Sequence, residues 1–290
     1  MPHPGWAAFS FDGIGTSWEI STPVTLDGSQ RRRLLDVVEK YDAAWSRFRA
    51  DSTVAQAARE PGRFRMPDGA GALGRLYRSL YRLTDGAMTP LIGVSLEQLG
   101  YGPDCSLRSR GTPVPAPRWD DVLDWDDAVL TTTAPVVLDV GAAGKGQLAD
   151  LLAAELRSQG AGEHFIDASG DLLNSGPVPV TVALEHPYDP GRAIGTISLG
   201  AGALCASAAN RRAWGDGLHH VLDGTTGSPV RTVVATWALA EDAMTADALA
   251  TALFFVSGKA LQQYFGFSWL TVFSDGSAAY SAGFEGVLFE

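Results

Sequence analysis

The longest apolar stretch of the chain, residues 246–256, contains a carboxylate and is too short to cross a membrane. A membrane-spanning helix needs about 18 or more apolar residues in a row, and no stretch reaches that length. With 290 residues, 46% of them hydrophobic, the chain can instead bury a substantial core. We therefore expect a globular protein that is not inserted in a membrane. Its residues 1–290 form one domain, or two sub-lobes divided by the proline-rich loop near 102–119.

The charge balance and the cysteines exclude several classes of protein. The chain carries 33 acidic and 22 basic residues, a net charge of −11, which argues against sequence-independent binding to nucleic acid. Cys105 and Cys205 alone make no disulfide framework and no metal cluster. The first residues carry neither a basic and apolar leader nor a lipidation cysteine. We expect a cytoplasmic protein.

The order of predicted elements indicates an α+β fold with a largely antiparallel sheet. Helices are predicted after a cap at Asp27 and over 73–83, 146–159 and 243–256. Strands are predicted at 6–11, 18–20, 136–140, 164–168, 178–184, 194–199 and 232–239, with a closing hairpin over 269–284.

Asp247 and Thr251 are four residues apart in the predicted helix over 243–256, so their side chains share one helix face. Their alanine and leucine neighbours press this face into the protein, and the helix holds no lysine or arginine to pair with the carboxylate. A carboxylate and a hydroxyl oxygen on adjacent turns suit a hard cation such as Mg²⁺. The alternative is an aspartate near a helix start that interacts favourably with the helix dipole.

A loop of small residues, 138–146, joins the predicted strand over 136–140 to the next predicted helix. Such a loop lets backbone N–H groups approach a phosphate, and Lys145 adds a positive charge at the helix start. The pattern is not that of a Walker P-loop, because Gly146 follows Lys145. A phosphate-binding loop and an ordinary strand-to-helix turn both fit it.

Two histidines, His219 and His220, precede Asp223 in the segment 218–230. They could be metal ligands, or a base with its orienting carboxylate. A zinc pattern of the H-E-x-x-H type is absent. The alternative is a histidine held by hydrogen bonds in a strand, followed by a simple turn at 223–227.

Several segments, in this order, resemble the ApbE-like family of FAD:protein FMN transferases. The resemblance spans residues 13 to 258 and rests on Gly15-Thr16 and on the segments 46–52, 84–93, 138–146, 168–171, 220–229 and 246–252. The segments 206–211 and 214–217 are similar to the actinobacterial branch of the family in particular.

This resemblance implies an ApbE-like, T-fold-related architecture of mixed sheets with packed helices. It implies a Mg²⁺-assisted reaction in which FMN passes from FAD to a threonine hydroxyl of a target flavoprotein, and AMP leaves. Asp247 and Thr251 would hold the metal with the backbone carbonyl of Ala142, and His220 would be the base or position FAD. The residues that the resemblance implies as FAD contacts are Ile14, Phe48, Ala87, Met88, Thr89, Asp139, Lys145 and Val221.

One residue departs from the family pattern, because Thr89 stands where the family usually has an aspartate. Two other activities are consistent with the same residues. An FAD pyrophosphatase would give FMN to water instead of to a protein, and a non-catalytic flavin-binding protein would bind FAD without cleaving it.

Overall fold

The computed structural model describes residues 3–104, 106–210, 213–215 and 217–289. Cys105, Arg211 and Asp216, which the sequence analysis names singly or within segments, lie outside the described residues.

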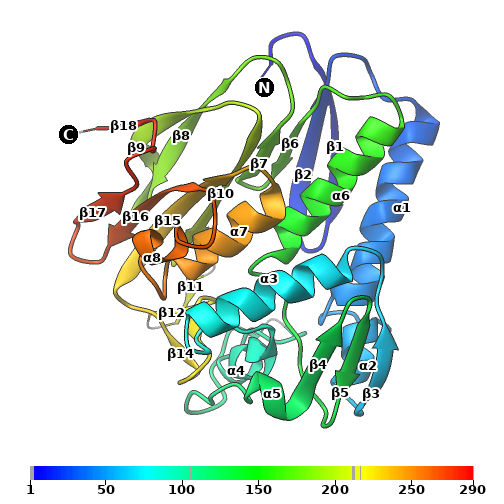
Figure 1. Ribbon diagram of the computed structural model, residues 1–290, viewed down its shortest axis with the longest axis vertical. Helices are drawn as coiled ribbons and strands as arrows, with labels where there is room; N and C mark the ends of the chain where they lie inside the picture. The colour runs from blue at the N-terminus through cyan, green and yellow to red at the C-terminus, as the bar shows by residue number, and fades with distance from the viewer. Residues whose placement is uncertain (1–2, 105, 211–212, 216, 290) are drawn as a thin grey trace.

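A large antiparallel sheet is the frame of the molecule (Figure 1). Over the described ranges, eight strands form it in the order β1-β2-β6-β7-β10-β15-β16-β17. Their bounds are Ala7–Gly13, Thr16–Thr22, Phe165–Ala168, Asp171–Asn174, Gly202–Ala208, Val233–Ala240, Ser268–Phe273 and Ala278–Tyr280. β7 pairs with β10 only from Gly202 to Leu204, whereas β15 pairs with β10 as far as Ala208. The second half of β10 therefore extends beyond the short hairpin β6–β7.

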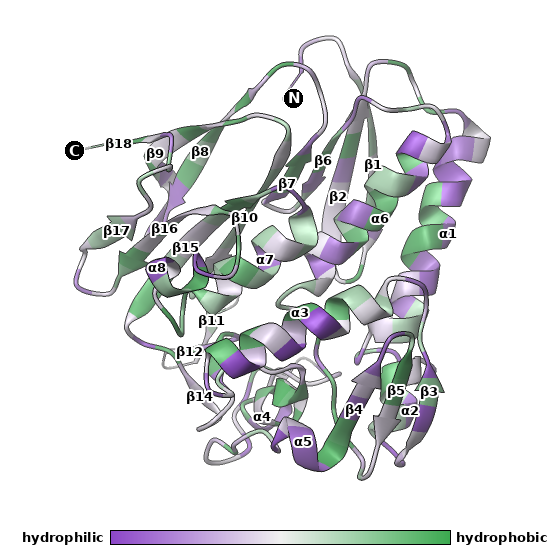
Figure 2. Cartoon of the chain, viewed as in Figure 1, coloured by the Kyte–Doolittle hydropathy of each residue, from purple (hydrophilic) through white to green (hydrophobic). Residues whose placement is uncertain are grey.

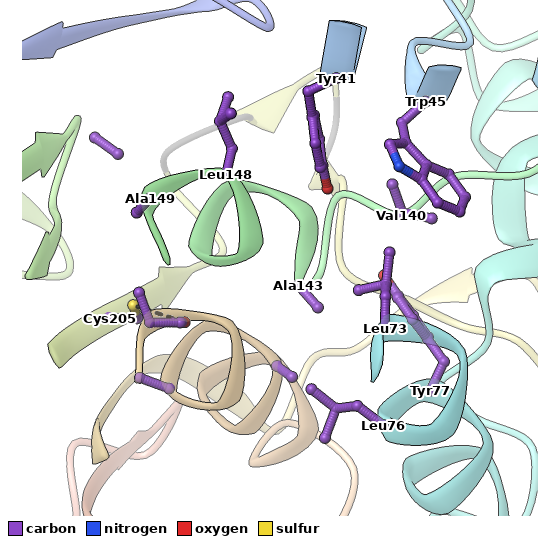
Figure 3. Close-up of a cluster of buried hydrophobic side chains, with 14 of the residues drawn as sticks. Tyr41, Trp45, Leu73, Leu76, Tyr77, Val140, Ala143, Leu148, Ala149 and Cys205 are labelled. Carbon is purple, nitrogen blue, oxygen red and sulfur yellow. Dashed lines mark hydrogen bonds between the residues drawn. The ribbon is translucent and has the colours of Figure 1, made fainter. Parts of the chain in front are cut away.

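Three helices cover one face of this sheet: α1 (Gly28–Trp45), α6 (Gly144–Ser158) and α7 (Ala243–Ala252). α7 packs on β10 and β15, α6 packs on α7, and α1 packs on α6. Figure 3 shows α6 between side chains of α1 on one side and α7 on the other. α1 begins with the predicted cap, because the Asp27 side chain accepts hydrogen bonds from the N–H groups of Ser29 and Gln30.

A smaller sheet lies on the opposite face of the main sheet. In the described part of the chain its order is β18-β9-β8, with bounds Gly286–Leu288, Asp189–Leu199 and Val180–His186. One apolar cluster joins the two sheets, with Leu184 and Ile197 from the smaller sheet against Leu204, Trp237 and Leu270 from the larger one. This pairing forms a β-sandwich beside the helical layer.

A third sheet, ordered β3-β5-β4, packs with α3 at the other end of the molecule (Figure 1). The bounds of its strands are Gly62–Arg65, Val129–Thr132 and Leu123–Asp126. The helices of this region are α2 (Thr53–Ala57), α3 (Ala70–Leu83), η1 (Pro90–Ile92), α4 (Gly93–Gln98) and α5 (Trp119–Val122). The remaining elements are β11 (Ala213–Trp214), β12 (Leu218–His219), β13 (Leu222–Asp223), β14 (Ser228–Pro229) and α8 (Gly258–Leu261).

The α+β class and the antiparallel sheet are confirmed, but two predicted elements are wrong in detail. Val136, Leu138 and Val140 are buried, but residues 136–140 do not form a strand. Two of their backbone N–H groups bond to helix carbonyls instead of a neighbouring strand: Val136 donates to Ala57, the last residue of α2, and Asp139 donates to Pro90, the first residue of η1. α7 ends at Ala252, four residues earlier than predicted, and Gly258 begins α8 instead of capping α7.

Hydropathy follows this layering (Figure 2). α1 is largely hydrophilic on its exposed face, whereas α7 is largely apolar, with Ala246, Ala248, Leu249 and Ala250 fully buried. No helix in the described ranges is long and apolar enough to span a membrane. The organisation of residues 1–290 as one domain, with or without two sub-lobes, stays a prediction.

Candidate active site

A cavity of about 530 Å³ opens where the short hairpin β6–β7 ends and β10 continues. Segments from distant parts of the chain line it. The N-terminal half contributes Thr16 on β2, residues 87–89, Asp139, Gly141, Ala142 and Lys145. The C-terminal half contributes Ser169, Gly170, Val182, Ala183, Glu185, residues 206–208, residues 220–222, and Asp247 and Thr251 on α7. Most of the residues predicted from the sequence therefore meet in one place.

Asp247 lies on the buried side of α7 with only 4% of its surface exposed, and it still lines the cavity. Its Oδ2 accepts a hydrogen bond of 2.9 Å from the backbone N–H of Gly146, at the start of α6. A glycine is required there, because a Cβ on residue 146 would stand 2.1 Å from the carbonyl oxygen of Ala243. The sequence predicted a carboxylate that needs a partner, and α6 supplies one.

Lys145 is held at the cavity by an ion pair that the sequence analysis did not predict. Its Nζ lies 2.8 Å from Oδ2 of Asp171, a residue with 1% of its surface exposed. Burial works to lower the pKa of Lys145, but the nearby carboxylates of Asp171 and Asp247 outweigh it, so the pKa is raised. Lys145 is therefore positively charged, between two buried carboxylates.

Thr251 lies one turn of α7 beyond Asp247 and lines the same cavity, as predicted from their spacing. Its Oγ1 is 3.2 Å from the hydroxyl oxygen of Ser207 on β10. Ser207 also lines the cavity and was not singled out by the sequence analysis. Thr251 and Ser207 therefore line the same cavity as Asp247.

Asp139 follows the extended segment 136–138 and is fixed in the cavity wall by Arg47. Its Oδ2 lies 2.6 Å from Nε of Arg47, and its Oδ1 accepts a hydrogen bond of 2.7 Å from the N–H of Gly141. Arg47 also donates to the carbonyl oxygen of Tyr101, at 2.8 Å, and its guanidinium lies over the ring of Phe48. Arg47 was missed as a site residue, although a cation between aromatic residues is a usable signal.

Two predicted FAD contacts, Ile14 and Phe48, do not line the cavity. Ile14 is a non-glycine residue with a positive φ of 46°, and its side chain packs on the main core. The next two residues, Gly15 and Thr16, line the cavity instead. Phe48 is 42% exposed and contacts the ring of Tyr101, which is itself part of the lining. Both residues are thus neighbours of the cavity wall.

The segment 87–89 lines the cavity with all three residues. The Thr84 hydroxyl accepts a hydrogen bond from the N–H of Met88, and the N–H of Gly224 donates to the carbonyl of Ala87. Thr89, which replaces the usual aspartate, is 5% exposed, and its hydroxyl accepts a hydrogen bond from the N–H of Leu91. At this position the threonine caps the short helix η1.

The two adjacent histidines have different surroundings. His220 and Val221 line the cavity. His219 points elsewhere: its Nε2 lies 2.8 Å from the carbonyl oxygen of Val230, and burial lowers its pKa. Asp223 accepts hydrogen bonds from the N–H and hydroxyl of Thr225, so it stabilises its own turn. The structure therefore separates His220 as the candidate site residue.

The oxygen donors at the cavity fit Mg²⁺. Within the part of the chain that the structure describes, no three His, Cys, Asp or Glu side chains group to hold a metal ion by themselves. Asp247, Thr251 and the carbonyl of Ala142 offer oxygen atoms only, and all three residues line the cavity. Mg²⁺ is commonly held by one or two carboxylates together with substrate phosphates and water.

A family model described as the ApbE family matches residues 14–267. The chain belongs to the ApbE family. Among solved structures, an ApbE protein from Thermotoga maritima has a TM-score of 0.80 and 26% identity, covering 97% of this chain and 99% of that one. A structure titled flavin transferase ApbE, from Vibrio cholerae, has a TM-score of 0.76 over 95% of this chain and 96% of that one; at 21% identity it supports the ApbE fold alone.

Two curated relatives of this ApbE chain are named FAD:protein FMN transferase. The one from Rhodobacter capsulatus is 29% identical over 204 residues, which are 66% of this chain and 39% of that protein. The one from Vibrio cholerae is 29% identical over 193 residues, which are 59% of this chain and 56% of that protein. The chain thus aligns with about half or less of the length of these two relatives.

Proposed function

We propose that this ApbE-family chain is a Mg²⁺-dependent FAD:protein FMN transferase. The observation that carries the proposal is the convergence of Asp247, Thr251, Lys145, Asp139 and His220 on one cavity, from segments far apart in sequence. The names of the curated relatives support the same activity. The proposed substrates are FAD and a target flavoprotein that presents a threonine hydroxyl.

In the proposed reaction the threonine oxygen attacks the phosphorus atom of the FMN half of FAD. A new P–O bond to threonine forms, the pyrophosphate P–O bond to AMP breaks, and the threonine proton leaves. Phosphoryl transfer of this kind depends on positioning the groups and neutralising charge. The reaction therefore needs cationic groups and N–H donors near the pyrophosphate, and an acceptor for one proton.

The chain offers a residue for each requirement. Bound Mg²⁺, held by Asp247, Thr251 and the Ala142 carbonyl, would neutralise charge that develops on the pyrophosphate. Lys145 adds a second positive charge at the start of α6, where the positive end of the helix dipole also favours an anion. His220 takes up the threonine proton or positions FAD. Residues 87–89, Asp139 and Val221 shape the flavin-binding wall, with Ile14 and Phe48 behind it.

Two finer assignments belong to the same proposal. We place the chain in the actinobacterial branch of the family on the segments 206–211 and 214–217, of which the structure describes 206–210, 214, 215 and 217. The cytoplasmic location stays a prediction from the sequence.

The proposal is tested by incubating the chain with FAD and Mg²⁺, with and without a target flavoprotein domain. A matched domain with the acceptor threonine changed to valine is the control. We expect flavin fluorescence on the denatured target band, and AMP in equal amount. Neither should appear on the valine variant.

Other outcomes identify the two alternative activities. AMP and free FMN, in equal amounts with or without the target and with no labelled band, would mean that water is the acceptor. FAD that binds and is recovered intact would mean a flavin-binding protein without catalysis. Either result would contradict the transferase proposal.

A further inference from the structure

α6 and α7 exchange polar contacts in both directions where their first turns meet. α6 donates the backbone N–H of Gly146 to the carboxylate of Asp247 on α7. One turn later, α6 presents the carboxylate of Asp150 to the start of α7. Oδ1 of Asp150 accepts a 2.9 Å hydrogen bond from the N–H of Ala243, and Oδ2 accepts a 2.8 Å bond from the N–H of Met244.

We propose that Asp150 is a positioning residue that sets the register of α7 on α6 and so places Asp247 and Thr251 for the metal ion. The inference rests on the metal site in the proposed function. Asp150 does not line the cavity and would not touch the metal. It would act through the two N–H groups that begin the helix carrying both ligands.

The packing between the helices leaves little freedom for α7 to shift. A Cβ on Gly146 would stand 2.1 Å from the carbonyl oxygen of Ala243 and 2.8 Å from the Cβ of Asp247. The backbones are therefore in direct contact at this point. Gly146 and Asp150 are four residues apart, so they lie on one face of α6 and bind α7 at successive turns. These hydrogen bonds restrict both the translation of α7 along α6 and its rotation.

The start of α7 has two acidic partners, of which only Asp150 comes from another helix. α7 already has its own cap, because the side chain of Asp242 accepts a hydrogen bond of 2.8 Å from the N–H of Thr245. Asp150 reaches the two remaining N–H groups from another helix.

The carboxylate is also costly for stability. Burial raises the pKa of Asp150 to about 6, and the two backbone hydrogen bonds counteract only part of this. Asp242 nearby raises the pKa further, Arg157 lowers it, and the thiol of Cys205 lies in the same electrostatic neighbourhood. Asp150 is therefore ionised at neutral pH at a cost to stability, and a role in positioning accounts for its presence.

The test uses the full chain and three variants. Asp150→Ala and Asp242→Ala each remove a carboxylate that binds the first turn of α7, but only Asp150 joins α7 to α6. Asp150→Asn keeps the shape of the side chain, with one oxygen left to accept. Mn²⁺ binding is measured by electron paramagnetic resonance without FAD, alongside thermal unfolding and the Mg²⁺ concentration that half-saturates AMP release.

We expect Asp150→Asn and Asp150→Ala to weaken Mn²⁺ binding about tenfold or more, the usual effect of losing a group that orients a metal ligand. Asp242→Ala should lower the melting temperature without changing Mn²⁺ affinity. The ratio of wild-type to Asp150→Asn affinity should shrink as the pH falls below about 6, where wild-type Asp150 gains a proton.

Wild-type affinity in Asp150→Asn, or equal losses in the two alanine variants, would overturn the positioning role. If Asp150→Ala does not fold, the Mn²⁺ affinity of Asp150→Asn alone decides the outcome. A wild-type chain that binds Mn²⁺ but labels no target would contradict the proposed function and leave this inference standing. A wild-type chain that binds no Mn²⁺ either without or with FAD would overturn both.

Discussion

The aromatic cluster at α3 and the junction of α6 with α7 both lie largely inside the molecule, but they are built from opposite kinds of side chain. The aromatic cluster consists of Trp45, Tyr77, Tyr81, Trp119 and Trp125, with ring centroids 5.4 to 6.4 Å apart between neighbours. The junction instead holds Lys145, Asp150 and Asp247 within a helical layer that is otherwise rich in alanine, and Asp171 of β7 pairs with Lys145.

The difference indicates that the aromatic cluster mainly serves stability and the junction mainly serves function. Aromatic side chains bury large apolar areas and gain further from their relative geometry, so the aromatic cluster stabilises the fold. Buried charges, by contrast, often add little net stability, because the cost of removing them from water offsets their attraction. The charged residues at the junction are therefore best explained by a role in catalysis or substrate binding. Mutations at the junction should mainly change activity, whereas mutations in the aromatic cluster should mainly change the free energy of unfolding.

Asp247→Ala should have the largest effect on activity. Removing the single proposed carboxylate ligand should abolish Mg²⁺-dependent turnover of FAD, while near-ultraviolet circular dichroism still reports a folded chain. AMP release across a range of Mg²⁺ concentrations checks this, with Asp242→Ala as a control on the same helix. Normal turnover at low Mg²⁺ would show that the metal site lies elsewhere.

Lys145→Ala should lower both FAD binding and stability, because Lys145 lines the cavity and also pairs with the buried carboxylate of Asp171. We expect weaker FAD binding in calorimetric titration. We also expect a loss of roughly 3–5 kcal/mol in the free energy of unfolding, because Asp171 is left buried without its partner. Asp171→Asn combined with Lys145→Ala should recover stability but not FAD affinity. Wild-type FAD affinity in Lys145→Ala would contradict the phosphate-binding role of this loop.

Trp119→Ala should change stability alone. The side chain is 3% exposed and packs against Tyr81 and Trp125, away from the cavity. We expect the free energy of unfolding, measured with urea, to fall by roughly 3–5 kcal/mol. Turnover per folded molecule should equal that of wild type at a temperature where both are folded. A selective loss of turnover would mean that the two regions are coupled.

Thr251→Val should have the smallest effect. It removes a neutral oxygen and keeps the side-chain volume, so Mg²⁺ affinity should fall less than in Asp247→Ala. The change in the free energy of unfolding should be about 1 kcal/mol or less, because only the hydrogen bond to Ser207 is lost. Ser207→Ala, which removes that bond and keeps Thr251, is the matched control. Equal effects of the two substitutions on Mg²⁺ affinity would argue against Thr251 as a ligand.

The sequence predicts what local pattern controls. The helix face that carries Asp247 and Thr251, the cap at Asp27 and the α+β class all follow from spacing and residue type. Strand β10 was missed, since its run of small residues lacks the β-branched side chains that mark a strand. Residues 136–140 look like a strand, but no neighbouring strand pairs with them in the described structure.

Pairs that depend on tertiary contact could not be predicted. Lys145 and Asp171 meet because α6 and the hairpin β6–β7 pack together, and Arg47 meets Asp139 across 92 positions of sequence. Nothing in the residues near Asp150 indicates that its carboxylate accepts a hydrogen bond from the first residue of another helix, 93 positions later. These contacts arise from packing, which no spacing rule along one segment encodes.

The most direct test of the account is an anomalous-scattering map from crystals of this chain grown with FAD and Mn²⁺ in place of Mg²⁺. The account predicts one strong Mn²⁺ peak bonded to Asp247, Thr251 and the carbonyl oxygen of Ala142, with the FAD pyrophosphate between it and Lys145. A peak at another group of residues, with Asp247 bound only to the N–H of Gly146, would contradict it.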